Sequence, residues 1–345
     1  MGRLLSALVV LCSYAHTLWG DPFNPALTDL EEMSQDFVLE SKQIHIEGYP
    51  LAFNPSLIRW KGEPLLFFRA RDLKNRSTDG MGVVWLDEQL APCSDAQILQ
   101  IEYKGRTFPS KQQEPKPIAI GDRLFLIYNN TISPYLNPEI RRVHQVELFF
   151  DGNQFTAGAP DCYLEYTEEN RQRPEKNWVP FEYDNELYLA YSIVPHLILR
   201  PVLGTSCCET FCQSSACAPW DWGVLRGGTP ALLAGNEYLA FFHSSINMPS
   251  VYSKGKVVLH YVMGAYTFSA IPPFQITRIS AEPIVSKNFY HGPNYRTWKP
   301  LHVVFPGSFI QDEQFIWLAY GRQDHEIWIA KLDKQGLFDS LIPVP

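Results

Sequence analysis

Five segments of the chain repeat one pattern of polar and apolar positions. In each, a short polar turn rich in Gly, Asp or Asn is followed by a run of aromatic and aliphatic residues, which is typical of a β-hairpin that leads into a buried strand. The segments are residues 60–69, 120–129, 183–192, 233–243 and 310–321. Because almost no helical periodicity separates them, the pattern predicts an all-β protein built from repeated hairpins.

A proline lies a few residues before each of these turns, inside another apolar stretch. Proline cannot donate to a strand ladder and therefore favours edge strands, such as the innermost strand of a propeller blade, which faces the central channel. The five prolines are Pro55, Pro115, Pro180, Pro230 and Pro306. We therefore expect a five-bladed β-propeller, closed by residues 37–39 or 44–46, with an irregular β-sandwich as the alternative.

The composition supports a packed, folded chain. Its 345 residues are 46% hydrophobic, which is enough for a sizeable core, and we expect residues 21–345 to form a single domain. Acidic residues outnumber basic ones by 37 to 29, and no Lys/Arg-rich block occurs. A nucleic-acid partner is therefore not expected.

The longest apolar stretch lies at the start of the sequence. Arg3 precedes an apolar run over residues 4–11, which is too short to span a bilayer but matches the core of a signal peptide. We expect residues 1–20 to be a signal peptide, and the protein to be exported without membrane insertion. The sequence does not indicate an oligomeric state.

Cleavage after residue 20 would leave six cysteines, and export favours disulfides over a metal site. They are Cys93, Cys162, Cys207, Cys208, Cys212 and Cys217. Four of them lie in the insert formed by residues 204–219, without the paired Cys or His spacing of a zinc site. We expect either a disulfide-braced lid over the site or a long exposed loop that disulfides merely fix.

Polar residues recur where the predicted strands meet the channel, and they are mostly basic or carboxylic. After the second strands come Arg69, Arg71, His243 and Asp324; beside the prolines come Glu114, Lys116, Glu175, Lys176, Asn177 and Arg226. Such side chains either neutralise one another or bind a ligand. Donors around one or two carboxylates suit a sugar, and Arg, Lys and His together suit a phosphate.

Several motifs in these blades resemble one known family. They are residues 175–181 (EKNWVPF), residues 226–230 (RGGTP), residues 261–266 (YVMGAY), and residues 303–307 (VVFPG) with Tyr320, Gly321 and Asp324. Their order resembles that of glycoside hydrolase family 130 over about residues 50–335. The resemblance implies a five-bladed propeller that acts on β-mannosides with inversion, by hydrolysis or by phosphorolysis to mannose 1-phosphate.

The resemblance also implies roles for single residues. The family's Glu-Asp-Pro-Arg motif, whose aspartate is the proposed proton donor, falls on residues 113–116 (QEPK), so that Glu114 takes the place of the acid and Lys116 that of the arginine. Lysine lacks the bidentate fork of arginine, so this motif is altered. Arg69, Lys176 and His243 match positions that hold phosphate in the family's phosphorylases.

Hydrolysis and phosphorolysis differ in the groups that they require. An inverting hydrolase needs an acid and a carboxylate base about 6.5–9.5 Å apart, and Glu175 is the candidate base. The alternative for Glu175 is a surface carboxylate that pairs with Lys176. A phosphorylase needs only the acid, because phosphate is the nucleophile. No cofactor is expected; inorganic phosphate is the co-substrate in the phosphorylase case.

Other functions stay open at this point. Export favours hydrolysis, since mannose 1-phosphate made outside the cell would waste the energy of the glycosidic bond. The altered acid motif favours a divergent mannosyltransferase-like relative or a non-catalytic glycan-binding propeller. A propeller that binds other proteins is a further class, but no specific feature of the sequence indicates it.

Overall fold

The computed structural model describes residues 27–71, 79–101, 112–133, 140–158, 162–166, 174–293, 295–297 and 299–345. The signal peptide predicted for residues 1–20 lies outside these ranges. The described chain is almost entirely β, with one 3-10 helix, η1 (Leu30–Met33), and one α-helix, α1 (Lys334–Ser340). Within the described part of the chain, no helix is long and apolar enough to cross a membrane.

The described strands form four sheets of mainly antiparallel neighbours. The first sheet contains β2 (Ala52–Trp60), β3 (Glu63–Arg71), β4 (Asp79–Trp85) and β5 (Gln97–Ile98). The second begins with β6 (Gln113–Ile120), β7 (Arg123–Ser133), β8 (Ile140–Phe150), β9 (Phe155–Ala157) and β10 (Cys162–Tyr166), and continues through β11 (Val179–Tyr183), β12 (Glu186–Ser192), β13 (His196–Pro201) and β14 (Cys207–Ser214). Its two halves are joined by the parallel pair β10 and β14.

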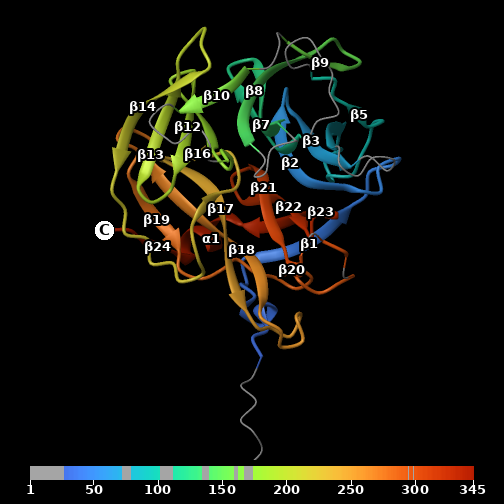
Figure 1. Ribbon diagram of the computed structural model, residues 1–345, viewed down its shortest axis with the longest axis vertical. Helices are drawn as coiled ribbons and strands as arrows, with labels where there is room; N and C mark the ends of the chain where they lie inside the picture. The colour runs from blue at the N-terminus through green and yellow to red at the C-terminus, as the bar shows by residue number, and fades with distance from the viewer. Residues whose placement is uncertain are drawn as a thin grey trace, which may run out of the picture.

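The C-terminal half of the chain forms the other two sheets. One contains β15 (Arg226–Gly227), β16 (Leu232–Ala234), β17 (Glu237–Met248), β18 (Val258–Ser269), β19 (Ile276–Ser280), β20 (Leu301–His302) and β24 (Leu341–Pro343). The other contains β21 (Val304–Gln311), β22 (Phe315–Arg322), β23 (Glu326–Asp333) and the N-terminal strand β1 (Val38–Ile44). In Figure 1 these groups follow one another around the molecule in chain order, and blue β1 lies beside red β23.

The five hairpins predicted from the repeated pattern are all present. The strand pairs β2 and β3, β6 and β7, β11 and β12, β16 and β17, and β21 and β22 are each antiparallel and joined by a tight turn. As expected for the N-terminal segment, β1 joins the C-terminal sheet, where it pairs with β23. The proline-bearing strands β2, β6, β11 and β21 lie at sheet edges, as the missing proline N–H requires.

These edge strands contact one another across the middle of the molecule. The Ser56 hydroxyl donates to the Pro115 carbonyl between β2 and β6, and the Ser308 hydroxyl donates to the Leu57 carbonyl at 2.6 Å between β21 and β2. Gly307 makes the second approach possible, since a Cβ there would collide with the Pro55 carbonyl oxygen. Backbone polar groups that proline strands leave without ladder partners are thus satisfied between sheets.

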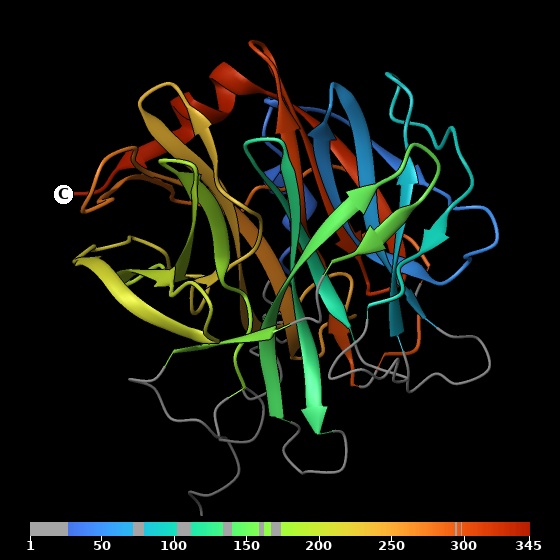
Figure 2. The ribbon, with the colours of Figure 1, turned by 90° about the horizontal axis from the view of Figure 1, so that it is seen from above.

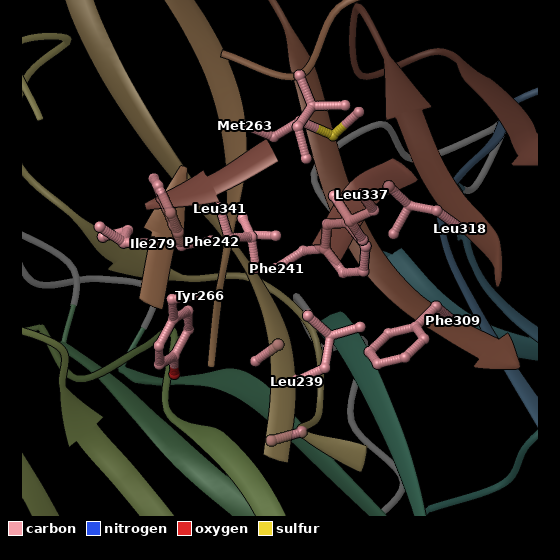
Figure 3. Packing of buried hydrophobic residues seen from close by; sticks show 14 of the residues in the cluster. Leu239, Phe241, Phe242, Met263, Tyr266, Ile279, Phe309, Leu318, Leu337 and Leu341 are labelled. Atoms are coloured by element: carbon pink, nitrogen blue, oxygen red, sulfur yellow. The ribbon is translucent and has the colours of Figure 1, made fainter. Parts of the chain in front are cut away.

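The hydrophobic core is divided among the spaces between neighbouring sheets. Figure 3 shows the largest cluster, where Phe241 and Phe242 of β17 pack with Tyr266 of β18 and with Phe309 of β21. Phe241 and Phe309 form an edge-to-face pair with ring centroids 5.2 Å apart. Helix α1, red at the margin of the molecule in Figure 2, covers this cluster with Leu337.

The cysteine-rich insert is in large part a strand of the sheet, and the disulfides expected in it stay a prediction. Residues 207–214 form the regular strand β14, which pairs with β13 and β10, so this part of the insert belongs to the sheet. Among the described residues, the thiols of Cys93, Cys207, Cys212 and Cys217 are free. Cys207 and Cys208 are adjacent in a strand, so their side chains point to opposite faces. The Cys212 thiol donates instead to the Pro273 carbonyl at 3.4 Å.

Candidate active site

The strand register brings the predicted site residues to one end of the molecule. Phe53 at the start of β2 pairs with Arg69 near the end of β3, and Gln113 at the start of β6 pairs with Asn129 of β7. In the same way Arg226 of β15 pairs with His243 of β17. The hairpin turns lie at the other ends of these strands, so the polar strand ends gather away from the turns.

Glu114 is aimed by a distortion of strand β6. The ladder between β6 and β7 is interrupted between Gln113 and Lys116, and Glu114 has a left-handed φ of 55° just before Pro115. Such a conformation is rare for a glutamate, and bulges of this kind redirect side chains. The half-buried carboxylate accepts a hydrogen bond from Asn129 Nδ2 at 2.6 Å, which fixes one oxygen. Asn54 of β2 repeats the conformation, with a φ of 47° before Pro55.

Lys116 lies two residues further along β6 and is buried, with 3% of its surface exposed. Its Nζ atom has no hydrogen-bond partner among the described residues. Burial lowers the pKa of this ammonium group to about 8, and the nearby Glu114 carboxylate partly opposes the shift. A buried cation without a hydrogen-bond partner is costly, which makes Lys116 a candidate for binding an anion.

His243 stands in the middle of several cationic side chains. Burial holds the pKa of this imidazole well below its usual range, and the positive charges of Lys176, Lys116 and Arg226 lower it further. Its Nδ1 atom has no described hydrogen-bond partner, and its ring packs on Phe305 with centroids 4.6 Å apart. The imidazole is therefore neutral near pH 7. The name cation cluster refers below to the three cations Lys116, Lys176 and Arg226 together with the neutral imidazole of His243 that they act on.

The arginines of β3 form a separate part of the site. Arg69 forms an ion pair with Asp79 of β4, and Arg71 Nε lies 3.4 Å from the same carboxylate. Asp324 follows β22 and interacts electrostatically with the same region: burial raises its pKa, and Arg69 and Arg71 partly reverse that shift. The Glu114 carboxylate also raises the pKa of Asp324. Arg69, Arg71 and Glu114 therefore all lie close enough to Asp324 to change its pKa.

Glu175 is held in a closed environment. One oxygen of its carboxylate accepts a hydrogen bond from Trp178 Nε1 at 3.2 Å, and the other accepts one from the Tyr191 hydroxyl at 3.3 Å. Only 9% of the residue is exposed, so the alternative of a solvated surface carboxylate beside Lys176 is wrong. Lys176 itself is exposed, whereas Asn177 is buried and has a left-handed φ of 66°.

Two residues of this region were missed by the sequence reasoning. Asp79 starts β4, a third strand that the repeated hairpin pattern does not cover, and only the strand register places it beside the arginines. Tyr261 of β18 stacks on His243 with ring centroids 6.1 Å apart. Burial raises the pKa of the Tyr261 hydroxyl, and Asp324 and Glu114 add to that effect. The sequence signal for Tyr261 was its place at the start of residues 261–266.

Solved structures with the same fold come from proteins that handle glycosides. No protein-family model and no curated protein matches the sequence. A putative glycoside hydrolase from Parabacteroides distasonis aligns with a TM-score of 0.60 and 14% identity, over 88% of this chain and 96% of that one. A structure described as belonging to the GH130 family of mannoside phosphorylases aligns with a TM-score of 0.59 and 12% identity, over 90% and 96%. This chain has the fold of that family.

A third structure carries a ligand of interest. It is a mannose phosphorylase from Leishmania mexicana in complex with a phosphate ion, with a TM-score of 0.56, 14% identity, and coverage of 92% of this chain and 94% of that one. The resemblance drawn from the sequence motifs is thereby confirmed for the fold. At these identities the likeness does not extend to the chemistry of single residues.

Proposed function

We propose that this protein is a five-bladed β-propeller enzyme that cleaves β-mannosides by phosphorolysis. Each repeated hairpin, with the strands added to it, would be one blade, and β1 would complete the fifth. The site would lie where the strand ends meet, opposite the hairpin turns. The substrate would be a mannose-containing saccharide, and inorganic phosphate the second substrate.

The cation cluster is the observation that carries this proposal. Buried Lys116 has no described partner for its ammonium group, and the exposed cations Lys176 and Arg226 lie close enough to lower the pKa of His243. Positive charge gathered around a buried imidazole favours an anion over a neutral sugar. The phosphate-bound phosphorylase of the same fold supports this interpretation.

Glu114 would act as the acid. Its proton would pass to the glycosidic oxygen as the bond between that oxygen and the anomeric carbon breaks. A phosphate oxygen would attack the anomeric carbon from the opposite face, so the configuration would invert to give α-mannose 1-phosphate and a saccharide shortened by one residue. Asn129 would keep the carboxyl group oriented through its hydrogen bond to Oε2.

Phosphorolysis fits the structure better than hydrolysis. Hydrolysis with inversion requires a carboxylate that activates water. Both oxygens of Glu175 already accept hydrogen bonds, from the side chains of Trp178 and Tyr191. Glu175 therefore has the environment of a structural carboxylate that holds residues 174–178 in place. It does not have the environment of a catalytic base.

The titration of Lys116 gives a direct test of the phosphate site. Because the pKa of this lysine is about 8, it is charged below that pH and neutral above it. We expect the KM for phosphate in β-mannoside cleavage to be flat from pH 6.5 to about 7.5 and to rise about tenfold per pH unit above 8.5, as one proton is lost. The measurement is the initial rate against phosphate concentration across this range. A KM for phosphate that stays constant to pH 9.5 would contradict the assignment.

A further inference from the structure

Asp79 joins the two arginines of β3 into one unit. Its side chain, 5% exposed, forms ion pairs with both Arg69 and Arg71. The arginines are two residues apart on one strand, so their side chains project from the same face. Both guanidinium groups also lie over the ring of Phe53, with 4.6 Å from each Cζ to the centroid. We call Arg69 and Arg71 the arginine pair.

The arginine pair is the half of the site in which positive charge is partly compensated. Two positive charges face the single carboxylate of Asp79 directly, and this carboxylate offsets one of them. The cation cluster differs, because the charges that act on His243 are all positive. The described residues thus divide the site into one half in which the charges acting on His243 are all positive and another in which Asp79 offsets part of the positive charge.

The arginine pair keeps donors to spare despite this compensation. Each guanidinium carries five N–H groups in a fixed fork, and two ion pairs with one carboxylate occupy only a few of them. Arg69 Nε has no described hydrogen-bond partner. Fixed donors whose charge is partly offset suit the hydroxyl groups of a sugar, whereas a phosphate dianion would gain less there than at the cation cluster.

We infer that Asp79 is a positioning residue that reserves the arginine pair for an uncharged sugar and so directs phosphate to the cation cluster. The inference rests on the proposed function, because it assigns the two halves of the same site to the two substrates. It replaces the expectation that Arg69 holds phosphate. Asp79 itself need not touch either substrate, since it acts through the orientation and the charge of the two guanidinium groups.

The test compares Asp79→Asn with wild type by isothermal titration calorimetry. The probes are inorganic phosphate and methyl β-mannoside, each titrated separately into the full protein. We expect Asp79→Asn to bind one more phosphate per protein than wild type, because the arginine pair has lost its compensating charge. We also expect the Kd for methyl β-mannoside to rise about tenfold, because the guanidinium groups are no longer fixed.

Two further variants make the outcome decisive. Glu147→Gln removes an equivalent carboxylate from the exposed ion pair with Arg123 and should change neither measurement. Asp79→Glu keeps the charge and should restore the phosphate stoichiometry of wild type, while the Kd for the mannoside recovers only in part. A folded Asp79→Asn protein with unchanged stoichiometry and Kd, or an added phosphate in Asp79→Glu, would overturn the inference.

These binding measurements do not depend on turnover. A wild-type protein that binds both probes but forms no mannose 1-phosphate would refute the proposed function alone. Thermal unfolding checks that the Asp79→Asn protein is folded. If it is not folded, the binding measurements on Asp79→Glu alone test the inference. An Asp79→Glu protein that binds methyl β-mannoside as tightly as wild type would then overturn the role of Asp79 in positioning.

Discussion

Replacing Glu114 by glutamine is expected to lower kcat for β-mannoside cleavage by about two to four orders of magnitude, which is the usual contribution of a general acid. The amide has the shape of the carboxyl group and can still accept the hydrogen bond from Asn129 Nδ2, but it has no proton to give to the leaving oxygen. The Kd for the saccharide should stay within about threefold, since the amide keeps the size of the side chain and its hydrogen-bond acceptor. The measurements are steady-state kinetics and calorimetry with an unreactive mannoside.

A matched control is available on the first sheet. Glu88 lies in an exposed ion pair with Arg59, and Glu88→Gln should leave both kcat and Kd unchanged. Glu114→Gln with wild-type kcat would show that Glu114 is not the acid. A wild-type protein that binds the saccharide without cleaving it, and a Glu114→Gln variant that binds it equally, would favour the glycan-binding propeller.

Replacing Lys116 by methionine is expected to have opposite effects on phosphate use and on stability. The KM for phosphate should rise about tenfold to a hundredfold, the value of one charged hydrogen bond. The thermal midpoint should rise by about 2–4 °C, because an apolar side chain of similar length replaces a buried cation without a described partner. The rise of phosphate KM above pH 8 should disappear in this variant. Enzyme kinetics and thermal unfolding measure the three effects.

The comparison for this variant is an exposed lysine. Lys61 lies over the ring of Trp60 at the first hairpin turn, and Lys61→Met should leave the KM for phosphate unchanged. A Lys116→Met protein with an unchanged KM for phosphate would remove Lys116 from the cation cluster. A thermal midpoint that falls by several degrees would show that the ammonium group is structural.

The sequence predicted those parts of the fold that depend on local patterns. Each hairpin turn and its buried strand lie within a dozen residues. The change from a polar turn to an apolar run was therefore enough to place all five hairpins. The prolines placed the edge strands for an equally local reason, because Pro55 or Pro115 has no N–H for a ladder on either side. The grouping of Glu114, Lys116 and His243 then followed from the antiparallel register of strands whose order was already fixed.

Features that depend on contacts between distant strands were not predictable in the same way. Asp79 meets Arg69 and Arg71 only through the pairing of β3 with β4, and that strand carries no repeated signal. The insert at residues 204–219 was expected to be a loop or a lid, whereas its residues 207–214 form strand β14 between β13 and β10. The burial of Glu175 was not predictable either: Trp178 is only three residues away, but the fold has to turn its indole N–H and the Tyr191 hydroxyl toward the same carboxylate.

The most direct test of phosphorolysis is to follow the wild-type protein with short β-mannosides by 1H and 31P NMR, with and without inorganic phosphate. The account predicts that α-mannose 1-phosphate forms only when phosphate is present, together with a saccharide shortened by one residue. Release of free mannose at the same rate in both samples would contradict it and indicate hydrolysis.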